Sequence, residues 1–260
     1  CFPEEIDTFV DLFCGGCDVS INTQANSIYA NDINYHVIDI MKAFQQYDVD
    51  YLLEYIDTTI NQWCLNKTNE EGYKAFRDYY NKSKNPLDLY ILMCFSFNYQ
   101  FRFNSNHDYN NPFGKNRSSF NDVMRNNLII FKGRIEDIHF SSFDFLDFDY
   151  DVLKAGDFIY ADPPYLLTCG SYNDGKRGFR GWTGHDDIEL FRILTELSDR
   201  GVNFALSNVI EHKGLTNCNL ADWADTNGYF IHSINFNYNN CNYHTNNKTN
   251  VTREVLITNY

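Results

Sequence analysis

The chain has 260 residues, 43% of them hydrophobic and 17% aromatic, which is enough apolar material for an α/β domain with a second, smaller unit and excludes a disordered chain. It contains no run of about eighteen apolar residues, and its first residues lack the basic and apolar parts of a signal peptide, so we expect a cytoplasmic protein without a membrane segment. The formal net charge of -14 excludes a protein that coats nucleic acid nonspecifically, because each phosphate contact requires a local cation.

The N-terminal segment is typical of a sheet that binds a nucleotide-like ligand. The apolar run 8–13 predicts a strand, and the glycine turn Phe13-Cys14-Gly15-Gly16-Cys17 connects it to a helix that we expect near Val19. A second strand at 27–30 ends at Asn31-Asp32. We therefore predict the opening of a Rossmann-like, doubly wound α/β sheet, whose ligand crevice lies beyond the carboxyl ends of its strands.

The glycine turn and Asp32 together favour a nucleoside-type cofactor. Glycines let the backbone approach a ligand closely, and an acid about twenty residues later can accept hydrogen bonds from ribose hydroxyls. The turn is not followed by Gly-Lys-Ser/Thr and lacks the complete three-glycine pattern, which disfavours a triphosphate or a dinucleotide. An ordinary β-turn is the competing interpretation of the two glycines.

Between residues 37 and 137 the strand pattern largely disappears, and we predict an inserted, mostly helical domain. The helix-compatible stretches are 49–63, 70–80 and 86–94. The exception is 99–114, where Tyr99 to Asn104 alternate and a turn-rich segment follows, as in a β-hairpin. Six basic residues against two acidic ones between 100 and 134 give this region a local charge of +4 in an acidic chain, as expected of a face that binds duplex DNA.

After residue 138 the α/β pattern resumes, so 1–36 and 138–260 are expected to form one domain. An amphipathic helix is predicted at 186–200, and an Asn-rich loop at 237–250. The predicted strands are 140–145, 157–161, 202–206 (ending at Ser207-Asn208), 229–234 and 254–258.

The tetrapeptide Asp162-Pro163-Pro164-Tyr165, directly after a predicted strand, carries the chemistry. Two prolines continue neither a strand nor a helix, so they hold the chain extended where it leaves the sheet. Asp162 offers a carboxylate and Pro163 a carbonyl, two acceptors for the hydrogens of a planar amine, while the ring of Tyr165 can stack on a heterocycle. An ordinary strand exit is the alternative that this combination disfavours.

Cysteine and histidine give no sign of a metal site. The eight cysteines are scattered, and Cys14 and Cys17 have no second close pair to complete a zinc site, so we expect free thiols in a reducing compartment. The seven histidines show no ligand spacing. We expect no metal, and a monomer in solution.

In these motifs the sequence resembles the Dam-type DNA adenine-N6 methyltransferases, especially their compact phage-encoded members, over nearly the whole chain. Residues 101–104 and 111–115 resemble the DNA-reading hairpin of that family, which lies outside the generic methyltransferase core. The family also opens with a motif containing Gly and Lys that has no counterpart here, and the chain starts without Met, so we expect a preceding segment. The resemblance implies S-adenosylmethionine as cofactor, bound by Asp11, Phe13, Cys14, Gly15, Gly16, Asp32, Asp144, Phe145 and Asp162.

The implied reaction moves a methyl group onto adenine N6 in duplex DNA, at GATC by resemblance, after the base is flipped out of the stack. Asp162, Pro163, Pro164 and Tyr165 are the expected catalytic residues. The expected DNA-binding residues are Arg102 for readout of a guanine, with Tyr99 and Gln100 as its neighbours, Asn104 and Pro112 in the hairpin, and Lys115, Arg117 and Arg125 for phosphates.

Two alternatives stay open on the sequence. An amino-methyltransferase acting on RNA, cytosine N4 or a glutamine side chain would suit the same acceptor pair, and a homologue could bind cofactor or DNA without turnover. One departure from the family concerns the glycine turn. Cys17 stands where many members have glycine, a departure that is tolerable if the φ angle of Cys17 is ordinary.

Overall fold

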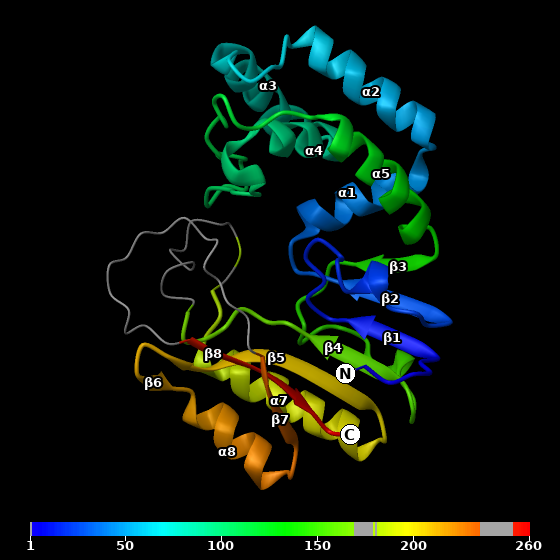
Figure 1. Cartoon of the computed structure of the whole chain (residues 1–260), viewed down its shortest axis with the longest axis vertical. Helices are drawn as coiled ribbons and strands as arrows, with labels where there is room; N and C mark the ends of the chain where they lie inside the picture. The colour runs from blue at the N-terminus through cyan, green and yellow to red at the C-terminus, as the bar shows by residue number, and fades with distance from the viewer. Residues whose placement is uncertain (1, 169–178, 180, 235–251) are drawn as a thin grey trace. The chain divides into compact units, whose positions relative to one another are not determined.

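The computed structural model describes residues 2–168, 179, 181–234 and 252–260 (Figure 1). These residues divide into two compact units. Among the described residues, the sheet unit comprises those up to Ile33 and those from Phe143 onward except Phe179, which belongs with 34–142 in the helical unit. The sequence placed the corresponding boundaries at 37 and 137. The Asn-rich loop expected at 237–250 lies outside the described residues.

The sheet unit is built on four parallel strands that are extended by an antiparallel pair. Its strands are β1 (Thr8–Asp11), β2 (Ser27–Asn31), β4 (Phe158–Ala161), β5 (Asn203–His212), β6 (Leu215–Thr216), β7 (Phe230–Ile234) and β8 (Thr252–Thr258). Within the unit their order is β2-β1-β4-β5-β8-β7, with β6 paired to β5. Strands β8 and β7 run antiparallel to their neighbours. The parallel core was expected, and this part of the fold prediction agrees with the structure.

The two faces of this sheet are covered differently. Alternate residues such as Val10, Ile159 and Phe204 point to one face, where they pack with α7 (Gly184–Asp199) and α8 (Cys218–Thr226). Phe9 and Phe158 point to the other face, against the N-terminal side chains of Phe2 and Ile6. Both long helices of the unit thus lie on one face, so the doubly wound arrangement that we expected, with helices on both faces, is not found among the described residues of this unit.

The helical unit contains five α-helices among its described residues, four of which begin at polar capping residues. The side chains of Asp48, Asn69, Asn85 and Asn121 each accept a backbone N–H of the first turn, which satisfies a donor that has no partner inside the helix. Helix α4 is buried along most of its length and packs against α1, α2 and α3. The elements are α1 (Tyr35–Gln46), α2 (Val49–Gln62), α3 (Glu70–Ser83), α4 (Pro86–Phe95), η2 (Phe97–Tyr99), α5 (Asp122–Ile135) and β3 (Ile138–Ser141).

The structure corrects four details of the predicted elements. The helix expected after the glycine turn is one 3-10 turn, η1 (Ser20–Asn22). The strand expected at 140–145 is β3, which ends at Ser141. β5 continues past Asn208 to His212 because it pairs with β8 over that length.

The fourth correction concerns the expected hairpin. It is an irregular segment with two isolated antiparallel bridges, Ser96 to Phe113 and Phe103 to Tyr109. Side chains such as that of Asn81 take over the role of the missing strand ladder.

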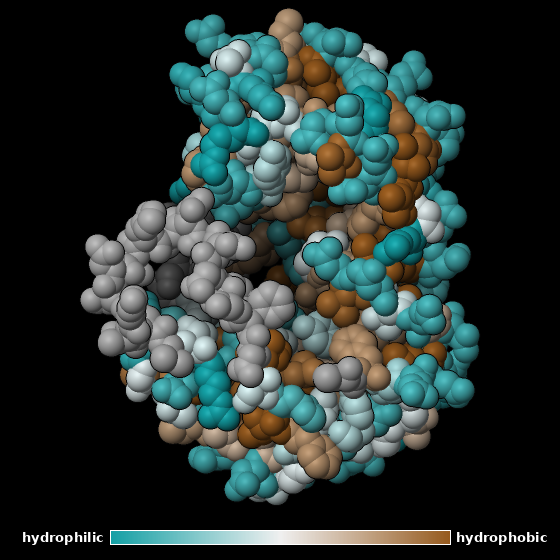
Figure 2. Space-filling view, viewed as in Figure 1, coloured by the Kyte–Doolittle hydropathy of each residue, from teal (hydrophilic) through white to brown (hydrophobic). Residues whose placement is uncertain are grey.

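The surface is mixed in character. Hydrophilic side chains cover most of the face shown in Figure 2, with apolar patches between them. On α5, Val123 and Ile130 are more than half exposed. None of the described helices has the length and apolar character that crossing a membrane would require.

Candidate active site at the carboxyl edge of the sheet

The strand register brings the predicted motifs of the sheet unit to one edge. Asp11 on β1 pairs with Ala30 on β2 and with Tyr160 on β4, and Ala161 pairs with Leu206 on β5. Since these strands are parallel, the residues that follow each of them lie side by side. Chain order reverses between β1 and β4, and in open α/β sheets ligands bind at such a reversal. Asp11 and Asp162 flank this position.

Asp11 is the most perturbed carboxyl group at this edge. It is only 1% exposed, and its Oδ2 accepts a hydrogen bond from Ser20 Oγ at 2.6 Å. Burial raises the pKa of Asp11 to about 7; the Ser20 hydrogen bond opposes the rise, and the negative charges of Asp162 and Asp32 add to it. Three predicted site carboxylates are therefore close enough to influence one another.

The glycine turn is held by backbone hydrogen bonds to the end of β2. Cys14 N donates to Asn31 O at 2.8 Å, and Gly15 N donates to Asp32 Oδ2 at 3.0 Å. Gly15 has a φ of 47°, and a Cβ built on it would meet nothing within 4 Å, so the space over the turn is open. The predicted cofactor residues Gly15 and Asp32 are thus in direct contact.

Cys17 does not meet the condition of an ordinary backbone conformation. Its φ is 65°, in the left-handed region, and its side chain is fully buried. This explains why glycine suits the position. The thiol of Cys14 is hydrogen-bonded to Cys17, and this bond together with burial raises the pKa of Cys14 far above its ordinary value, so Cys14 is expected to stay protonated.

The tetrapeptide 162–165 leaves β4 at the same edge. Asp162 is exposed and Pro163 is buried, which fixes the exit of the chain from the sheet. The hydroxyl of Tyr165 donates to Asp162 Oδ1 at 2.7 Å and lies 3.0 Å from Ser207 Oγ on β5. Partial burial of its carboxyl group raises the pKa of Asp162, and the charge of Glu254 adds to the rise, although the hydrogen bonds from Tyr165 and Ser207 oppose it.

Asp144 and Phe145 differ in exposure. Phe145 is only 3% exposed, and its ring packs against Phe13 and Trp182 with ring centroids 5.9 and 5.2 Å away. Asp144 is half-buried, and its Oδ1 accepts from Leu146 N at 3.1 Å. Asn31 holds this segment in place, because its side chain exchanges two hydrogen bonds with the backbone of Phe143.

The predicted DNA-binding residues lie in the helical unit, and most are exposed. Tyr99, Gln100, Arg102, Pro112, Lys115 and Arg117 are exposed, whereas Asn104 and Arg125 are half-buried. The Asn104 side chain closes the turn, because its Oδ1 accepts from the backbone of Asn106 and Asp108, both at 2.9 Å. Asn104 therefore has a clear structural role in this segment.

Side chains of α3 anchor the irregular segment. Asn81 pairs with both backbone groups of the buried Tyr109, accepting from its N at 2.8 Å and donating to its O at 3.1 Å. Tyr73 donates to Asn111 O at 2.9 Å, and Lys84 donates to His107 O at 2.9 Å. A Cβ on Gly114 would lie 2.6 Å from Ser96 O, so close packing requires glycine there. These contacts hold Arg102 on a fixed backbone without a regular hairpin.

The basic residues of this region are not all equally available for phosphate. The Arg125 guanidinium pairs with Asp57 of α2 and lies 5.3 Å from the centre of the Phe120 ring. Lys132 is largely buried and pairs with Glu136 at 3.0 Å. Arg117 lies over the Phe97 ring at 5.4 Å.

Three residues that contact the predicted site were not assigned to it from the sequence. They are Ser20, beside Asp11; Ser207, beside Tyr165; and Trp182, which packs on Phe13 and donates to Asp187 Oδ1 at 2.7 Å. Ser207 could have been found, since it follows the predicted strand next to the catalytic motif. Ser20 and Trp182 carry no signal in the sequence that distinguishes them from ordinary helix residues.

Comparisons with known proteins show the family to which the chain belongs. The family model for D12 class N6 adenine-specific DNA methyltransferases matches residues 1–240. The chain is 48% identical to the type II methyltransferase M.FokI of Planomicrobium okeanokoites and 47% identical to the modification methylase StsI of Streptococcus sanguinis. Both alignments cover all of this chain and 40% of the relative, so the chain spans about two fifths of the length of these relatives.

A more distant relative is the DNA adenine methylase of Escherichia coli, 23% identical over 78% of this chain and 72% of that protein. The resemblance drawn from the sequence motifs is thus confirmed at the level of the family, with higher identity to the two type II enzymes than to this methylase. Because the family model covers 240 of the 260 residues, the chain belongs to the D12 class N6 adenine-specific DNA methyltransferase family.

Proposed function

We propose that this chain transfers a methyl group from S-adenosylmethionine to the N6 amine of adenine in duplex DNA. Membership of the family supports the reaction type. The observation that carries the proposal is the position of Asp162 and Tyr165, which follow β4 beside the glycine turn that follows β1. Relatives named as a type II methyltransferase and a modification methylase support a role in modifying DNA for a restriction system.

The residues around the glycine turn fit S-adenosylmethionine. The open space over Gly15 allows a ligand to approach the backbone, and Asp32 stands at the end of β2, where a carboxylate can accept from ribose hydroxyls. The carboxylates of Asp11, Asp32 and Asp162 give the edge a negative potential that suits a cationic ligand. When bound, S-adenosylmethionine supplies a methyl group on a positively charged sulfur.

Asp162 and the Pro163 carbonyl are proposed to accept the two N–H groups of adenine N6. This hydrogen bonding orients the nitrogen and increases its electron density. The nitrogen lone pair forms the new N–C bond while the C–S bond breaks, its electrons remain on sulfur, and N6 then loses a proton. Because N6 is paired and stacked inside a duplex, the base must first be flipped out, and the Tyr165 ring offers a surface to stack on.

Recognition of DNA is assigned to the helical unit. Arg102 is exposed on a backbone that α3 anchors, which suits readout of a guanine in the major groove. Lys115 and Arg117 are exposed and are proposed to contact phosphates, as is Arg125 if DNA binding releases it from Asp57. GATC is the site that the Dam-type resemblance implies, and it is the first sequence to test.

The test is transfer of labelled methyl groups from S-adenosylmethionine to defined duplexes. One duplex contains GATC, one is hemimethylated at that site, and a pool carries random sequence around a central adenine. We expect label on adenine N6, and sequencing of the methylated pool gives the recognised site. Asp162→Ala should abolish transfer, whereas Asp222→Ala, which removes an exposed carboxylate on α8 of the same unit, should not.

The same assay separates the alternatives. Label found on RNA, on cytosine N4 or on a protein glutamine would show that this group, and not adenine N6, is the methyl acceptor. If calorimetry shows that the chain binds cofactor and duplex but no methyl group is transferred, the chain has a binding role and no catalytic one.

A further inference from the structure

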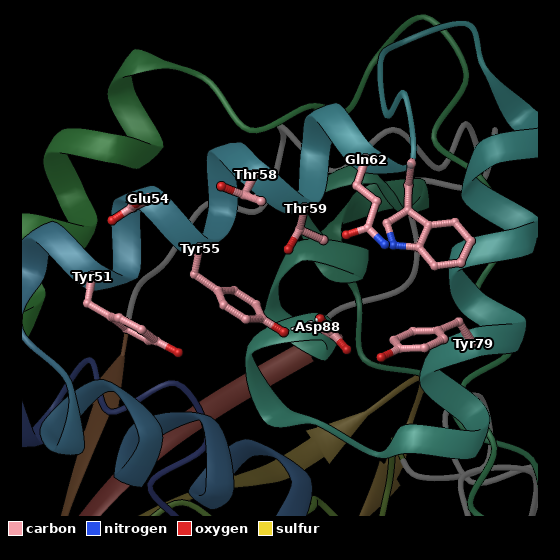
Figure 3. A pocket seen from close by; sticks show the side chains of 9 residues that line it. Tyr51, Glu54, Tyr55, Thr58, Thr59, Gln62, Tyr79 and Asp88 are labelled. Carbon is pink, nitrogen blue, oxygen red and sulfur yellow. Dashed lines mark hydrogen bonds between the residues drawn. The ribbon is translucent and has the colours of Figure 1, made fainter.

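A cavity inside the helical unit has a lining that methyl transfer does not explain. It has a volume of about 350 Å³, at the lower end of the range for small-molecule sites, and lies between α2, α3 and the start of α4. Tyr51, Tyr55 and Thr59 line it from one face of α2, at the spacing that puts side chains on one side of a helix (Figure 3). Trp63 and Tyr79 complete the aromatic part, with ring centroids 5.3 Å apart.

The aromatic walls of this cavity are unusually accessible. Tyr51 is 43% exposed and Tyr79 is 49% exposed, and neither is among the buried residues of its helix. Both rings are therefore partly open to solvent, and the Tyr51 ring stacks on Tyr47 with ring centroids 4.5 Å apart.

A carboxylate forms the inner end of the cavity. Asp88 is only 2% exposed, and its oxygens accept from Tyr55 OH at 2.8 Å and from Ser83 Oγ at 3.5 Å. Figure 3 shows the hydroxyl ends of Tyr55 and Tyr79 directed toward Asp88 from opposite sides. Asp88 lies in the first turn of α4, where the positive end of the helix dipole stabilises a negative charge. The dipole does not account for the open, aromatic space in front of the carboxylate.

Charge decides which ligand class fits. The described residues that line the cavity include Asp88 and Glu54 but no lysine or arginine. An anion would be repelled, and a neutral ligand would leave the buried carboxylate without a counter-ion. A cation with apolar substituents satisfies both parts of the lining, because aromatic faces attract cations and the carboxylate pairs with them.

We propose that this cavity binds an organic ammonium ion, held by the faces of Trp63 and Tyr79 and by the carboxylate of Asp88. The ion is either a free polyamine or the side chain of a lysine on a partner protein, since both present the same group. The site is separate from the residues assigned to cofactor and DNA, so it is tested independently of methyl transfer.

The first experiment uses Trp63 fluorescence of the 260-residue chain at constant ionic strength. Choline and 3,3-dimethylbutan-1-ol have the same shape, but only choline is charged. We expect choline to bind about tenfold more tightly than the alcohol. Equal binding of the two would overturn the proposal. Trp63→Phe should remove the signal change, because Trp182 and Trp223 lie elsewhere in the chain.

Variants then test the two parts of the lining. Asp88→Asn keeps an acceptor for Tyr55 and should weaken n-butylammonium binding about tenfold or more, whereas Asp122→Asn, another acid in the first turn of a helix of this unit, should not. Tyr79→Leu should weaken binding several-fold and Tyr79→Phe should not, since only the ring is required. Tyr79 is half exposed, so both variants should fold even if Asp88→Asn does not. Unchanged binding in Tyr79→Leu and Asp88→Asn would refute the site.

A last comparison identifies the source of the ammonium group. Tighter binding of spermidine than of Nα-acetyl-lysine methylamide would assign the site to a free polyamine. The reverse order would assign it to a lysine side chain.

Discussion

Replacing Asp11 with asparagine should remove a large pH dependence of stability. The pKa of Asp11 rises from an ordinary 3.8 to about 7 in the folded protein. The folded state therefore retains a proton that the unfolded chain loses, and stability falls as pH rises from about 4 to about 7. A rise of this size corresponds to about 4 kcal/mol, and because the side chain is only 1% exposed, solvent does not reduce it much.

The substitution Asp11→Asn keeps the shape of the side chain and an oxygen that accepts from Ser20 Oγ, but the amide cannot ionise. The variant should be nearly as stable as the parent near pH 3, more stable by about 2 kcal/mol at pH 5, and more stable by up to about 4 kcal/mol at pH 8. Urea denaturation at several pH values measures this difference. Other buried acids, among them Asp88 and Asp187, contribute equally to the pH dependence of stability in the parent and in the variant, so their contributions cancel in the difference.

Asp222→Asn, at an exposed carboxylate on α8, is the matched control and should follow the parent at every pH. Parallel pH profiles for Asp11→Asn and the parent would refute the reasoning, because they would mean that the ionisation of Asp11 is not coupled to folding.

Three further predictions address the turn, the motif and the recognition segment. Cys17→Gly should be more stable than Cys17→Ala by about 1 kcal/mol in urea denaturation, the reverse of the usual order, because only alanine keeps the strain of a φ of 65°; an alanine variant of equal or greater stability would contradict this. Tyr165→Phe removes a hydrogen bond that lowers the pKa of Asp162, so the acid limb of kcat/KM should move to higher pH, and an unmoved limb would exclude Asp162 as the titrating group. Asn81→Ala leaves the buried backbone of Tyr109 without its partners and should cost about 1–3 kcal/mol of stability. The same variant should weaken binding to duplex DNA while leaving S-adenosylmethionine affinity unchanged, which calorimetry can measure.

The sequence predicted the helices better than the irregular segments because the helix signals are local. Helix α2 begins beyond Asp48 and α4 at Pro86 after Asn85, and these capping residues stand in the sequence beside the apolar pattern. The length of β5 was underestimated because its last residues are stabilised by pairing with β8, which lies far along the chain. The hairpin was overestimated because alternation at 99–104 does not reveal that Asn81 and Tyr73 satisfy the backbone in place of a strand ladder.

The site could be predicted as far as strand ends could be placed. Asp32 and Asp162 each follow a predicted strand, and parallel strands bring such residues to one edge. The left-handed backbone of Cys17 could not be predicted, because a cysteine gives no sign of positive φ. Nor could the burial of Phe145, which depends on Phe13 and on Trp182 from a distant part of the chain.

The contacts of Tyr165 define what must happen before Asp162 can hold an amine. The tyrosine hydroxyl donates to Asp162 Oδ1, so an incoming N–H must share that oxygen or bind Oδ2. Ser207 Oγ lies 3.0 Å from the same hydroxyl, on a strand that is paired on both sides. The hydroxyl can therefore turn from Asp162 to Ser207 without losing its hydrogen bond, which keeps the energetic cost of freeing the carboxylate small. Since Ser207 is placed by the register of β5 against β4, the availability of the proposed catalytic carboxylate of Asp162 depends on strand pairing as well as on the tetrapeptide itself.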